Sequence, residues 1–269
     1  MEISKFEVSN VHPFFLIAGP CSIESKDHAI NHAGVINEIC QKLGINFVYK
    51  SSFDKANRSS KGSERGIGIE KGLNILSDVN KEFDIPTLTD VHESYQCKEV
   101  ANVVDIIQIP AFLCRQTDLL TAAAKTQKII NIKKGQFLAP WDMENVINKV
   151  LDIGNNNIML TERGTSFGYN TLVSDMRSIP QMSKFGFPII FDATHSVQQP
   201  GGLGLTSGGQ REFVSVLSRA AVSVGISGIF IEAHENPEKA PSDGPNMVKL
   251  SELKKLLTKL IEIDKIIKV

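Results

Sequence analysis

The chain has few cysteines, and no two of them form a close pair. Its 269 residues contain four cysteines, Cys21, Cys40, Cys97 and Cys114, and no Cys-x-x-Cys motif. Spacing of this kind is not that of a disulfide scaffold, which oxidising compartments favour. We therefore expect the thiols to stay reduced and the protein to be cytoplasmic.

The chain also lacks a charge excess, an apolar leader and a long apolar run. Lysine and arginine number 29 against 30 acidic residues, so the basic surplus typical of a nucleic-acid-binding protein is missing. The first ten residues contain no apolar signal region. No apolar run approaches the ~18–20 residues that cross a bilayer. We expect neither nucleic acid nor a membrane as partner.

Short apolar runs recur along the chain, and each is followed by a longer stretch of helical period. The runs are almost uninterrupted in apolar character, which is typical of strands buried on both faces of a parallel sheet. There are eight of them: Phe14–Gly19, Phe47–Ser51, Pro86–Val91, Ile106–Ala111, Ile129–Lys133, Asn157–Glu162, Pro188–Ala193 and Gly228–Ala233.

Three of the helical stretches have recognisable ends. The first ends at Gly44, and the second is an apolar stripe within 213–224 that stops at Gly225. The last begins near Ser251, a favourable N-cap. It buries leucines on one face.

Eight strands alternating with helices predict a (β/α)8 barrel, the TIM-barrel fold, as a single domain over residues 1–269. A doubly wound open sheet is the alternative, but no glycine fingerprint follows the first strand. Residues Glu2–Val8 are expected to add a short strand, forming a β-hairpin with the residues after Asn10.

Polar and charged residues follow every predicted strand, at the end where barrels of this kind carry their active sites. A structural barrel does not require polar chemistry at one rim of all eight strands. Cations are prominent there, and the loop after the second strand is especially basic. Arginine and lysine suit phosphate groups, so we expect a pocket for phosphorylated, multiply anionic small molecules rather than a merely solvated loop. The cations are Lys50, Lys55, Arg58, Arg115, Lys133 and Arg163.

A thiol, an imidazole and two carboxylates follow the first, seventh and eighth strands. These are Cys21, His195, Glu232 and Asp243, and the three strand ends become neighbours once the barrel closes. This donor set suits a divalent transition metal such as Zn²⁺, Fe²⁺, Mn²⁺ or Co²⁺. Two other roles remain open for the cysteine, a small buried side chain or a covalent nucleophile. A nucleophile, however, would not need both carboxylates.

Two further features have a functional and a plain interpretation. The loop Gln199–Gln210 contains five glycines in twelve residues, so it is either a lid that closes over the site or an ordinary surface loop. His28 and His32 stand at the i, i+4 spacing of metal ligands. Because their helix lies on the outside of the barrel, we expect both to be surface residues.

The motifs are those of one enzyme family. They lie in the segments Ile17–Ser25, Lys50–Ser60, Ile107–Asp118, Glu162–Tyr169, Phe191–Gln198 and Phe230–Glu235. Together they run over nearly the whole chain, which resembles the 3-deoxy-D-manno-octulosonate 8-phosphate synthases.

The resemblance implies a transferase that condenses phosphoenolpyruvate with D-arabinose 5-phosphate and releases phosphate, for lipopolysaccharide biosynthesis. It also implies a homotetramer of barrels. The family has a metal-dependent branch with cysteine in the first-strand motif and a metal-independent branch with asparagine there, and Cys21 is typical of the first.

Two alternatives to this function are a non-catalytic sugar-phosphate binding protein and the related synthase that uses erythrose 4-phosphate. In that synthase Lys-Pro-Arg-Thr-Ser is typical of the basic loop, where this chain has Lys55-Ala-Asn-Arg-Ser-Ser60.

The resemblance also assigns roles to individual residues, each of which is an expectation at this point. Lys50, Lys55, Lys133 and Arg163 surround phosphoenolpyruvate, with His195 as a further catalytic residue and metal ligand. Arg115 reaches the sugar phosphate bound by a neighbouring barrel. The remaining substrate-binding residues are Asn57, Arg58 and Ser59 at the sugar phosphate, Asp90 near the sugar hydroxyls, and Gln108 and Ala111.

Overall fold

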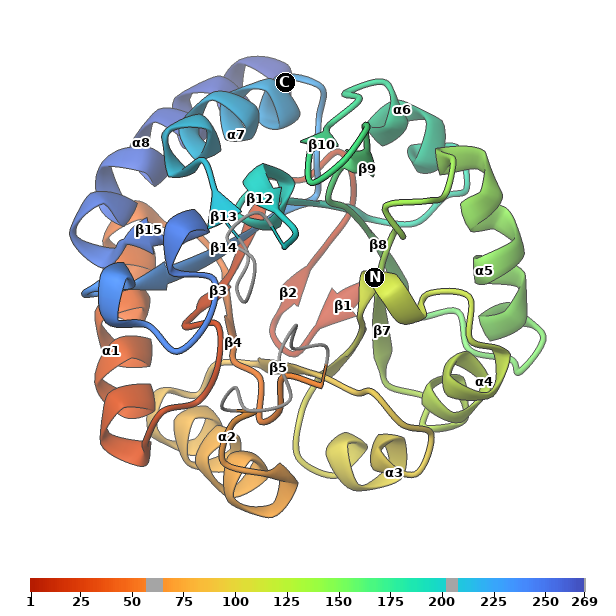
Figure 1. Ribbon diagram of the computed structural model, residues 1–269, viewed down its shortest axis with the longest axis horizontal. Coiled ribbons are helices and arrows are strands. Elements are labelled where there is room, and N and C mark those ends of the chain that lie inside the picture. Colours follow the sequence, from red (N-terminus) through yellow and green to blue (C-terminus); the bar gives the residue numbers. More distant parts are fainter. Residues whose placement is uncertain (57–64, 202–207, 269) are drawn as a thin grey trace.

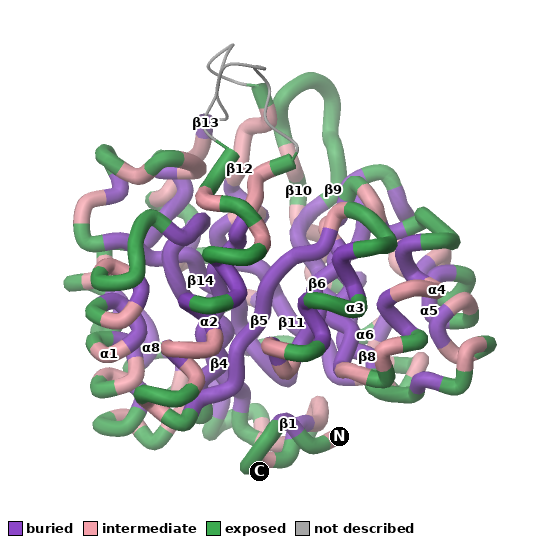
Figure 2. The backbone as a smooth tube through the Cα atoms, turned by 90° about the horizontal axis from the view of Figure 1, so that it is seen from below, coloured by how far each residue is buried: buried purple, intermediate pink, exposed green. Residues whose placement is uncertain are grey.

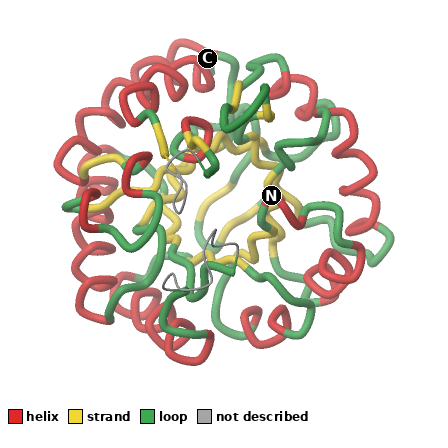
Figure 3. The backbone as a smooth tube through the Cα atoms, in the orientation of Figure 1, coloured by secondary structure: helices red, strands yellow, loops and turns green. Residues whose placement is uncertain are grey.

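The computed structural model describes residues 1–56, 65–201 and 208–268. Eight parallel strands close into a barrel, because β14 pairs with both β11 and β3. Helices surround the strands as an outer ring (Figures 1 and 3). The barrel strands in spatial order are β3 (Phe15–Gly19), β4 (Phe47–Lys50), β5 (Thr87–Asp90), β6 (Ile106–Ile109), β7 (Ile129–Lys133), β8 (Ile158–Glu162), β11 (Ile189–Asp192) and β14 (Gly228–His234).

Each of the eight apolar runs matches one barrel strand to within two residues at either end, so the predicted TIM barrel is confirmed. The helices alternate with the strands along the chain, as a parallel sheet requires. They are α1 (Lys26–Leu43), α2 (Ile69–Phe83), α3 (Gln96–Ala101), α4 (Thr117–Lys125), α5 (Met143–Leu151), α6 (Ser178–Ser183), α7 (Val214–Ser223) and α8 (Leu250–Ile267).

The predicted end of the first helix is correct, and its start has a clear cap. Ser25 accepts a hydrogen bond from the backbone N–H of His28, as an N-cap does. Gly44 follows α1 with φ 67°, a left-handed conformation that glycine adopts without a Cβ clash.

Two details of the later helices differ from expectation. Of the predicted stripe, Ala221 is buried, whereas Phe213 and Val216 are exposed; the other buried positions of α7 are Val214, Ser218 and Val222. The buried face of the helix therefore only partly coincides with the predicted stripe. Helix α8 begins at Leu250 with Lys249 as its N-cap, so Ser251 lies inside the helix. Its predicted leucine face is buried as expected.

Two apolar cores result from this architecture. The outer core lies between the strands and the helices, and the inner core fills the lower half of the barrel. The predicted N-terminal hairpin exists, but it forms within residues 2–7, between β1 (Glu2–Ile3) and β2 (Phe6–Glu7), and not with residues after Asn10. Ile3 and Val8 pack into the inner core from below.

Short antiparallel pairs rise from the opposite end of the barrel (Figure 2). One joins β9 (Thr165–Ser166) to β10 (Leu172–Val173), and the other joins β12 (Gln198–Gln199) to β13 (Gly208–Gly209). A last strand, β15 (Val248–Lys249), extends β14 in parallel. Within the described ranges no helix has the length and apolar character needed to cross a membrane.

Candidate active site

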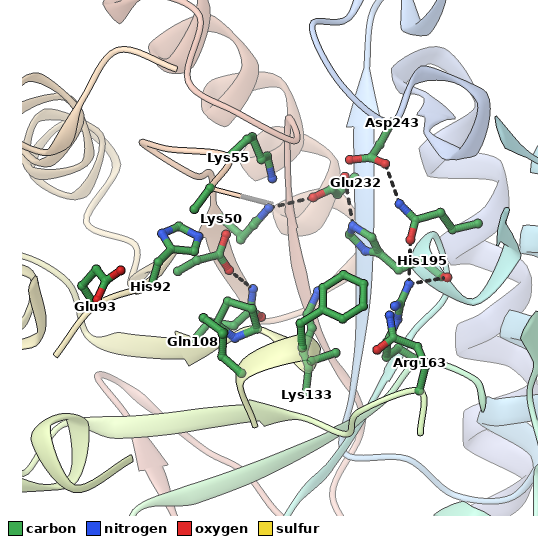
Figure 4. A pocket seen from close by; sticks show the side chains of 18 residues that line it. Lys50, Lys55, His92, Glu93, Gln108, Lys133, Arg163, His195, Glu232 and Asp243 are labelled. Atoms are coloured by element: carbon green, nitrogen blue, oxygen red, sulfur yellow. Dashed lines mark hydrogen bonds and ion pairs between the residues drawn. The ribbon is translucent and has the colours of Figure 1, made fainter. Parts of the chain in front are cut away.

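A cavity of about 260 Å³ opens at the C-terminal ends of the barrel strands. Most of the residues that line it have charged or polar side chains (Figure 4). The lining residues with ionisable or amide side chains are Lys50, Lys55, Asp90, His92, Glu93, Gln108, Lys133, Gln136, Arg163, His195, Gln198, Glu232 and Asp243. The cavity thus lies at the rim where the sequence analysis expected the site, with polar residues after every strand.

Lys50 stands at the end of β4 and is almost completely buried. Its Nζ donates to Glu232 Oε1 at 2.7 Å and to the backbone carbonyl of Cys21 at 3.2 Å. Burying a lysine is costly unless its charge is compensated, and the carboxylate on β14 provides that compensation. Two predicted site residues thus contact each other directly, although β3 lies between their strands, β4 and β14.

Lys133 at the end of β7 is held by a carboxylate that the sequence analysis did not select. Its Nζ donates to Asp192 Oδ2 at 2.6 Å and lies 3.9 Å from the centroid of the Phe230 ring, a cation–π contact. The same Asp192 contacts His195 Nδ1 at 2.8 Å. Burial would raise the pKa of Asp192, but His195 and Lys133 outweigh it and hold that pKa well below its usual range. An aspartate three residues before a candidate histidine was the available signal.

Arg163 follows β8 and contributes the third strand-end cation. One terminal nitrogen of its guanidinium donates to the backbone carbonyl of His195 and to Gln198 Oε1, both at 2.9 Å. Gln198 in turn donates to Asp243 Oδ1 at 2.8 Å. Gln198 was also missed, although it is the last residue of the motif Phe191–Gln198. The amide side chain links the cationic side of the cavity to the thiol–carboxylate side.

Three of the four predicted metal ligands converge. Ligand atoms of Cys21, Glu232 and Asp243 all lie within 4.8 Å of one another, and the thiol donates to Asp243 Oδ2 at 3.2 Å. His195 Nε2 lies 3.7 Å from Glu232 Oε2. Because Nδ1 of this histidine is engaged by Asp192, its Nε2 lone pair is free for a ligand, the usual arrangement at metal sites. These four groups can hold a divalent transition metal.

The environment of Cys21 argues against an unassisted nucleophile. The side chain is 1% exposed. Burial, with a further contribution from the charge of Glu232, raises the pKa of the thiol far above its ordinary value. A nucleophilic cysteine needs the opposite shift. A bound cation would itself lower this pKa, and Glu232 and Asp243 converge on the thiol, so the geometry favours the metal-ligand role over covalent catalysis.

Asp90 at the end of β5 faces the cavity among lysines. Burial would raise its pKa, but Lys50 and Lys55 outweigh burial and hold the carboxyl well below its usual range, so it is ionised. Its two oxygens accept hydrogen bonds from Ser52 and from the Gln108 amide nitrogen. Lys55 Nζ donates to the same serine at 3.0 Å. An ionised, accessible acceptor of this kind suits sugar hydroxyl groups.

The other predicted site residues fall into three groups. Ala111 lines the cavity, as expected. Arg115 is exposed and is not among the described residues that line the cavity of its own chain. Asn57, Arg58 and Ser59 lie outside the described residues, and so do residues 202–207 in the middle of the loop Gln199–Gln210 expected to act as a lid, whose two ends pair through β12 and β13.

The expectation that His28 and His32 are surface residues was wrong for His32, whereas His28 is half-buried. His32 is 3% exposed, and both rings lie beside His234 at the end of β14. His234 Nε2 contacts Glu24 Oε1 at 2.8 Å, while the backbone N–H of Asn236 donates to Nδ1. The ring must then carry its proton on Nε2, which disfavours a metal there. The contact instead ties the turn carrying Cys21 to the strand carrying Glu232.

Comparison with known proteins gives a consistent result over the full length. Residues 5–269 match the DAHP synthetase I family. The chain is 64% identical over 264 residues to a 2-dehydro-3-deoxyphosphooctonate aldolase of Bartonella quintana, covering 98% of this chain and 95% of that protein. Proteins with the same name from Brucella anthropi and Agrobacterium fabrum are 61% and 62% identical, covering 100% and 98% of this chain and 97% and 94% of their own lengths.

Proposed function

The chain belongs to the DAHP synthetase I family. We infer that it catalyses the reaction of its relatives, to which it is up to 64% identical. It condenses phosphoenolpyruvate with D-arabinose 5-phosphate and water to give 3-deoxy-D-manno-octulosonate 8-phosphate and inorganic phosphate. This is the activity of a 2-dehydro-3-deoxyphosphooctonate aldolase, and its product is a precursor of lipopolysaccharide.

One observation carries this inference from similarity to chemistry. Four cations, Lys50, Lys55, Lys133 and Arg163, come from three strand ends and one loop and all line one cavity. Phosphoenolpyruvate carries a phosphate and a carboxylate, and the sugar carries a second phosphate. Such cations reduce the repulsion between two anionic substrates and hold them in reacting positions.

The reaction forms one carbon–carbon bond and breaks one bond to phosphate. The methylene carbon of phosphoenolpyruvate attacks the sugar aldehyde, which leaves positive character on the carbon bearing the phosphate. Water adds to that carbon and gives up its two protons, one to the former aldehyde oxygen and one to the phosphate, which departs with its bonding electrons and leaves a ketone. Lys133 and Arg163 stabilise the departing anion. Asp90 and Gln108 orient the sugar hydroxyls.

A phosphate-release assay tests the proposed function and the related synthase together. The purified protein is incubated with phosphoenolpyruvate and either arabinose 5-phosphate or erythrose 4-phosphate, with a divalent metal present. We expect release with the five-carbon sugar and far less with the four-carbon one. No release with either sugar would indicate a binding protein, and preference for erythrose 4-phosphate would indicate the related synthase.

We also propose that the enzyme depends on a divalent transition metal held by Cys21, His195, Glu232 and Asp243. The convergence of three ligand atoms and the free Nε2 of His195 support this. When bound, such an ion would polarise the aldehyde or activate the water. Lys50 contacts Oε1 of Glu232, whereas Oε2 lies on the side of His195, so one carboxylate can serve both the lysine and the proposed ion.

Chelation and a cysteine comparison test the metal proposal. Exhaustive chelation is expected to abolish phosphate release, and Mn²⁺, Fe²⁺, Co²⁺ or Zn²⁺ to restore it. Cys21→Ser should lose bound metal by elemental analysis, whereas Cys97→Ser, a buried cysteine on α3, should retain it. Equal metal content in the two variants would contradict the proposed ligand set.

A homo-oligomer, expected to be a tetramer, is proposed from the surface beside the site. Large aromatic side chains are exposed in the segments that follow β6, β7 and β8, and Arg115 also follows β6; aromatic residues are enriched at interfaces. They include Phe112, Phe137, Trp141, Phe167 and Tyr169. In this proposal Arg115 leaves its own cavity to complete the sugar-phosphate site of a neighbouring chain.

Hybrid oligomers test this arrangement. Arg115→Ala and Lys133→Ala are each expected to be nearly inactive, and mixing them after dissociation should restore activity if Arg115 acts across the interface. Arg177→Ala, an exposed arginine paired with Asp175, serves as the control and should be active alone. Hybrids no more active than their parents would place Arg115 in its own site.

A cytoplasmic location is proposed as well, supported by four buried, unpaired thiols.

A further inference from the structure

Four polar side chains form a continuous hydrogen-bonded chain across the inside of the barrel. They come from four adjacent strands: Asp90 on β5, Gln108 on β6, Asn131 on β7 and Thr161 on β8. Thr161 Oγ1 donates to Asn131 Oδ1 at 2.7 Å, and Asn131 Nδ2 donates to Gln108 Oε1 at 2.9 Å. The Gln108 amide nitrogen then donates to Asp90. All four residues are buried.

The ionised Asp90 sets the direction of every bond in this chain. A carboxylate only accepts hydrogen bonds, so Gln108 must present its amide nitrogen to Asp90. Its oxygen then faces Asn131 and requires a donor, which is the amide nitrogen. The Asn131 oxygen is left to accept from the Thr161 hydroxyl. The orientation of both amides therefore follows from the charge at one end and the hydroxyl at the other.

Only the first two members of the chain reach the cavity. Asp90 and Gln108 line it, whereas Asn131 and Thr161 are not among the described residues that do so. Asp90 already accepts from Ser52 and Gln108, which leaves lone pairs for a substrate hydroxyl. Gln108 still has its second amide hydrogen. A sugar hydroxyl both donates and accepts, so an acceptor and a donor side by side match it.

We propose that Asn131 and Thr161 are positioning residues that fix the Gln108 amide and, through it, the acceptor face of Asp90 toward the hydroxyls of the aldehyde substrate. The inference rests on the proposed function, because it takes a polyhydroxylated sugar phosphate as that substrate. Neither residue touches phosphoenolpyruvate in this arrangement. Their contribution should therefore appear in the recognition of one substrate and not of the other.

Replacing the hydroxyl of Thr161 by a methyl group tests the proposal with matched controls. Thr161→Val leaves the Asn131 oxygen without its donor, and we expect KM for arabinose 5-phosphate to rise about tenfold with KM for phosphoenolpyruvate nearly unchanged. Thr161→Ser keeps the donor and should restore the wild-type value. Thr87→Val makes the same change on β5, at a buried threonine outside the chain, and should alter neither constant.

A double-mutant cycle adds a second measurement that packing alone would not affect. If Thr161 acts through Gln108, Thr161→Val should have little further effect in a Gln108→Met background. Independent, multiplicative losses would overturn the proposal, as would equal effects of Thr161→Val and Thr87→Val or a parallel rise in both KM values. Failure of the proposed function is distinguishable, because the wild type itself would then release no phosphate.

Discussion

The inside of the barrel consists of two layers with opposite chemistry, although they lie only two residues apart on the same strands. Side chains two apart on a strand share a face, so both layers point inward. The lower layer is apolar and the upper layer is polar or charged. The pairs are Val48 and Lys50, Leu88 and Asp90, Ile106 and Gln108, Ile129 and Asn131, Met159 and Thr161, Ile190 and Asp192, and Phe230 and Glu232.

The comparison shows how one scaffold separates stability from chemistry. Burying an apolar side chain in the lower layer stabilises the fold by roughly 1.5–3 kcal/mol. Burial of a charge in the upper layer is unfavourable unless a partner compensates it. The ion pairs Lys50–Glu232 and Lys133–Asp192 supply such partners. Anionic substrates would add further negative charge beside the two lysines. Substitutions in the two layers should therefore fail in different ways.

The largest expected effect is in the upper layer. Lys133→Met should lower kcat/KM on the order of 10²–10³-fold, because it removes a cation from the departing phosphate. Steady-state phosphate release measures this. Lys125→Met, an exposed lysine on α4, is the matched control and should stay close to wild type. Comparable losses in the two variants would mean that Lys133 has no specific role.

The lower layer should show the reverse pattern. Met159→Ala leaves a cavity in the inner core and should cost roughly 2–5 kcal/mol of unfolding free energy. Because Met159 is fully buried below the site, kcat/KM should change by less than about twofold well below the melting temperature. Denaturant unfolding and the phosphate assay measure the two quantities. A large fall in kcat/KM with unchanged stability would erase the distinction between the layers.

A smaller effect is expected from a buried ionisable group outside the barrel. Burial, with a contribution from His28, lowers the pKa of His32 from 6.5 to about 4. Between those pH values the unfolded chain binds more protons than the folded one, so stability falls as the pH falls from 6.5 toward 4. The loss should reach about 3 kcal/mol at most. In His32→Met, unfolding curves at pH 7 and pH 4.5 should differ less than in the wild type; an equal difference would contradict this origin.

Much of the fold could be predicted because strands buried on both faces leave an unmistakable pattern. The eight apolar runs, the glycine after α1 and the leucine face of α8 required no tertiary information. The buried face of α7 did require tertiary information, because Phe213, just before the helix, and Val214, at its start, are both apolar. Only the packing against the neighbouring strands decides which of them is buried. The position of the N-terminal hairpin likewise depended on the space beneath the inner core.

The candidate site divides in the same way. Cations, the cysteine and the carboxylates at strand ends were visible as unusual residues in polar loops. Asp192 and Gln198 were not selected, since each acts by holding another group and not by an unusual side chain of its own. Asn131 gave a faint signal, a polar residue in the middle of the apolar run Ile129–Lys133. His32 was wrongly predicted to be a surface residue, because its position on a helix does not reveal which other segments pack against it.

The sequence by itself determined the number of strands, their parallel arrangement and the polar rim. These follow from the alternation of apolar runs with helical stretches and from the polar residues that come after each run. The tertiary structure decided which groups meet. It set which lysine contacts which carboxylate, which nitrogen of His195 stays free, and in which direction the hydrogen bonds run in the chain that ends at Asp90. Because successive side chains of a strand point to opposite faces, the sequence specifies the face on which each side chain lies. Only closure of the barrel, with its stagger between strands, specifies what stands opposite.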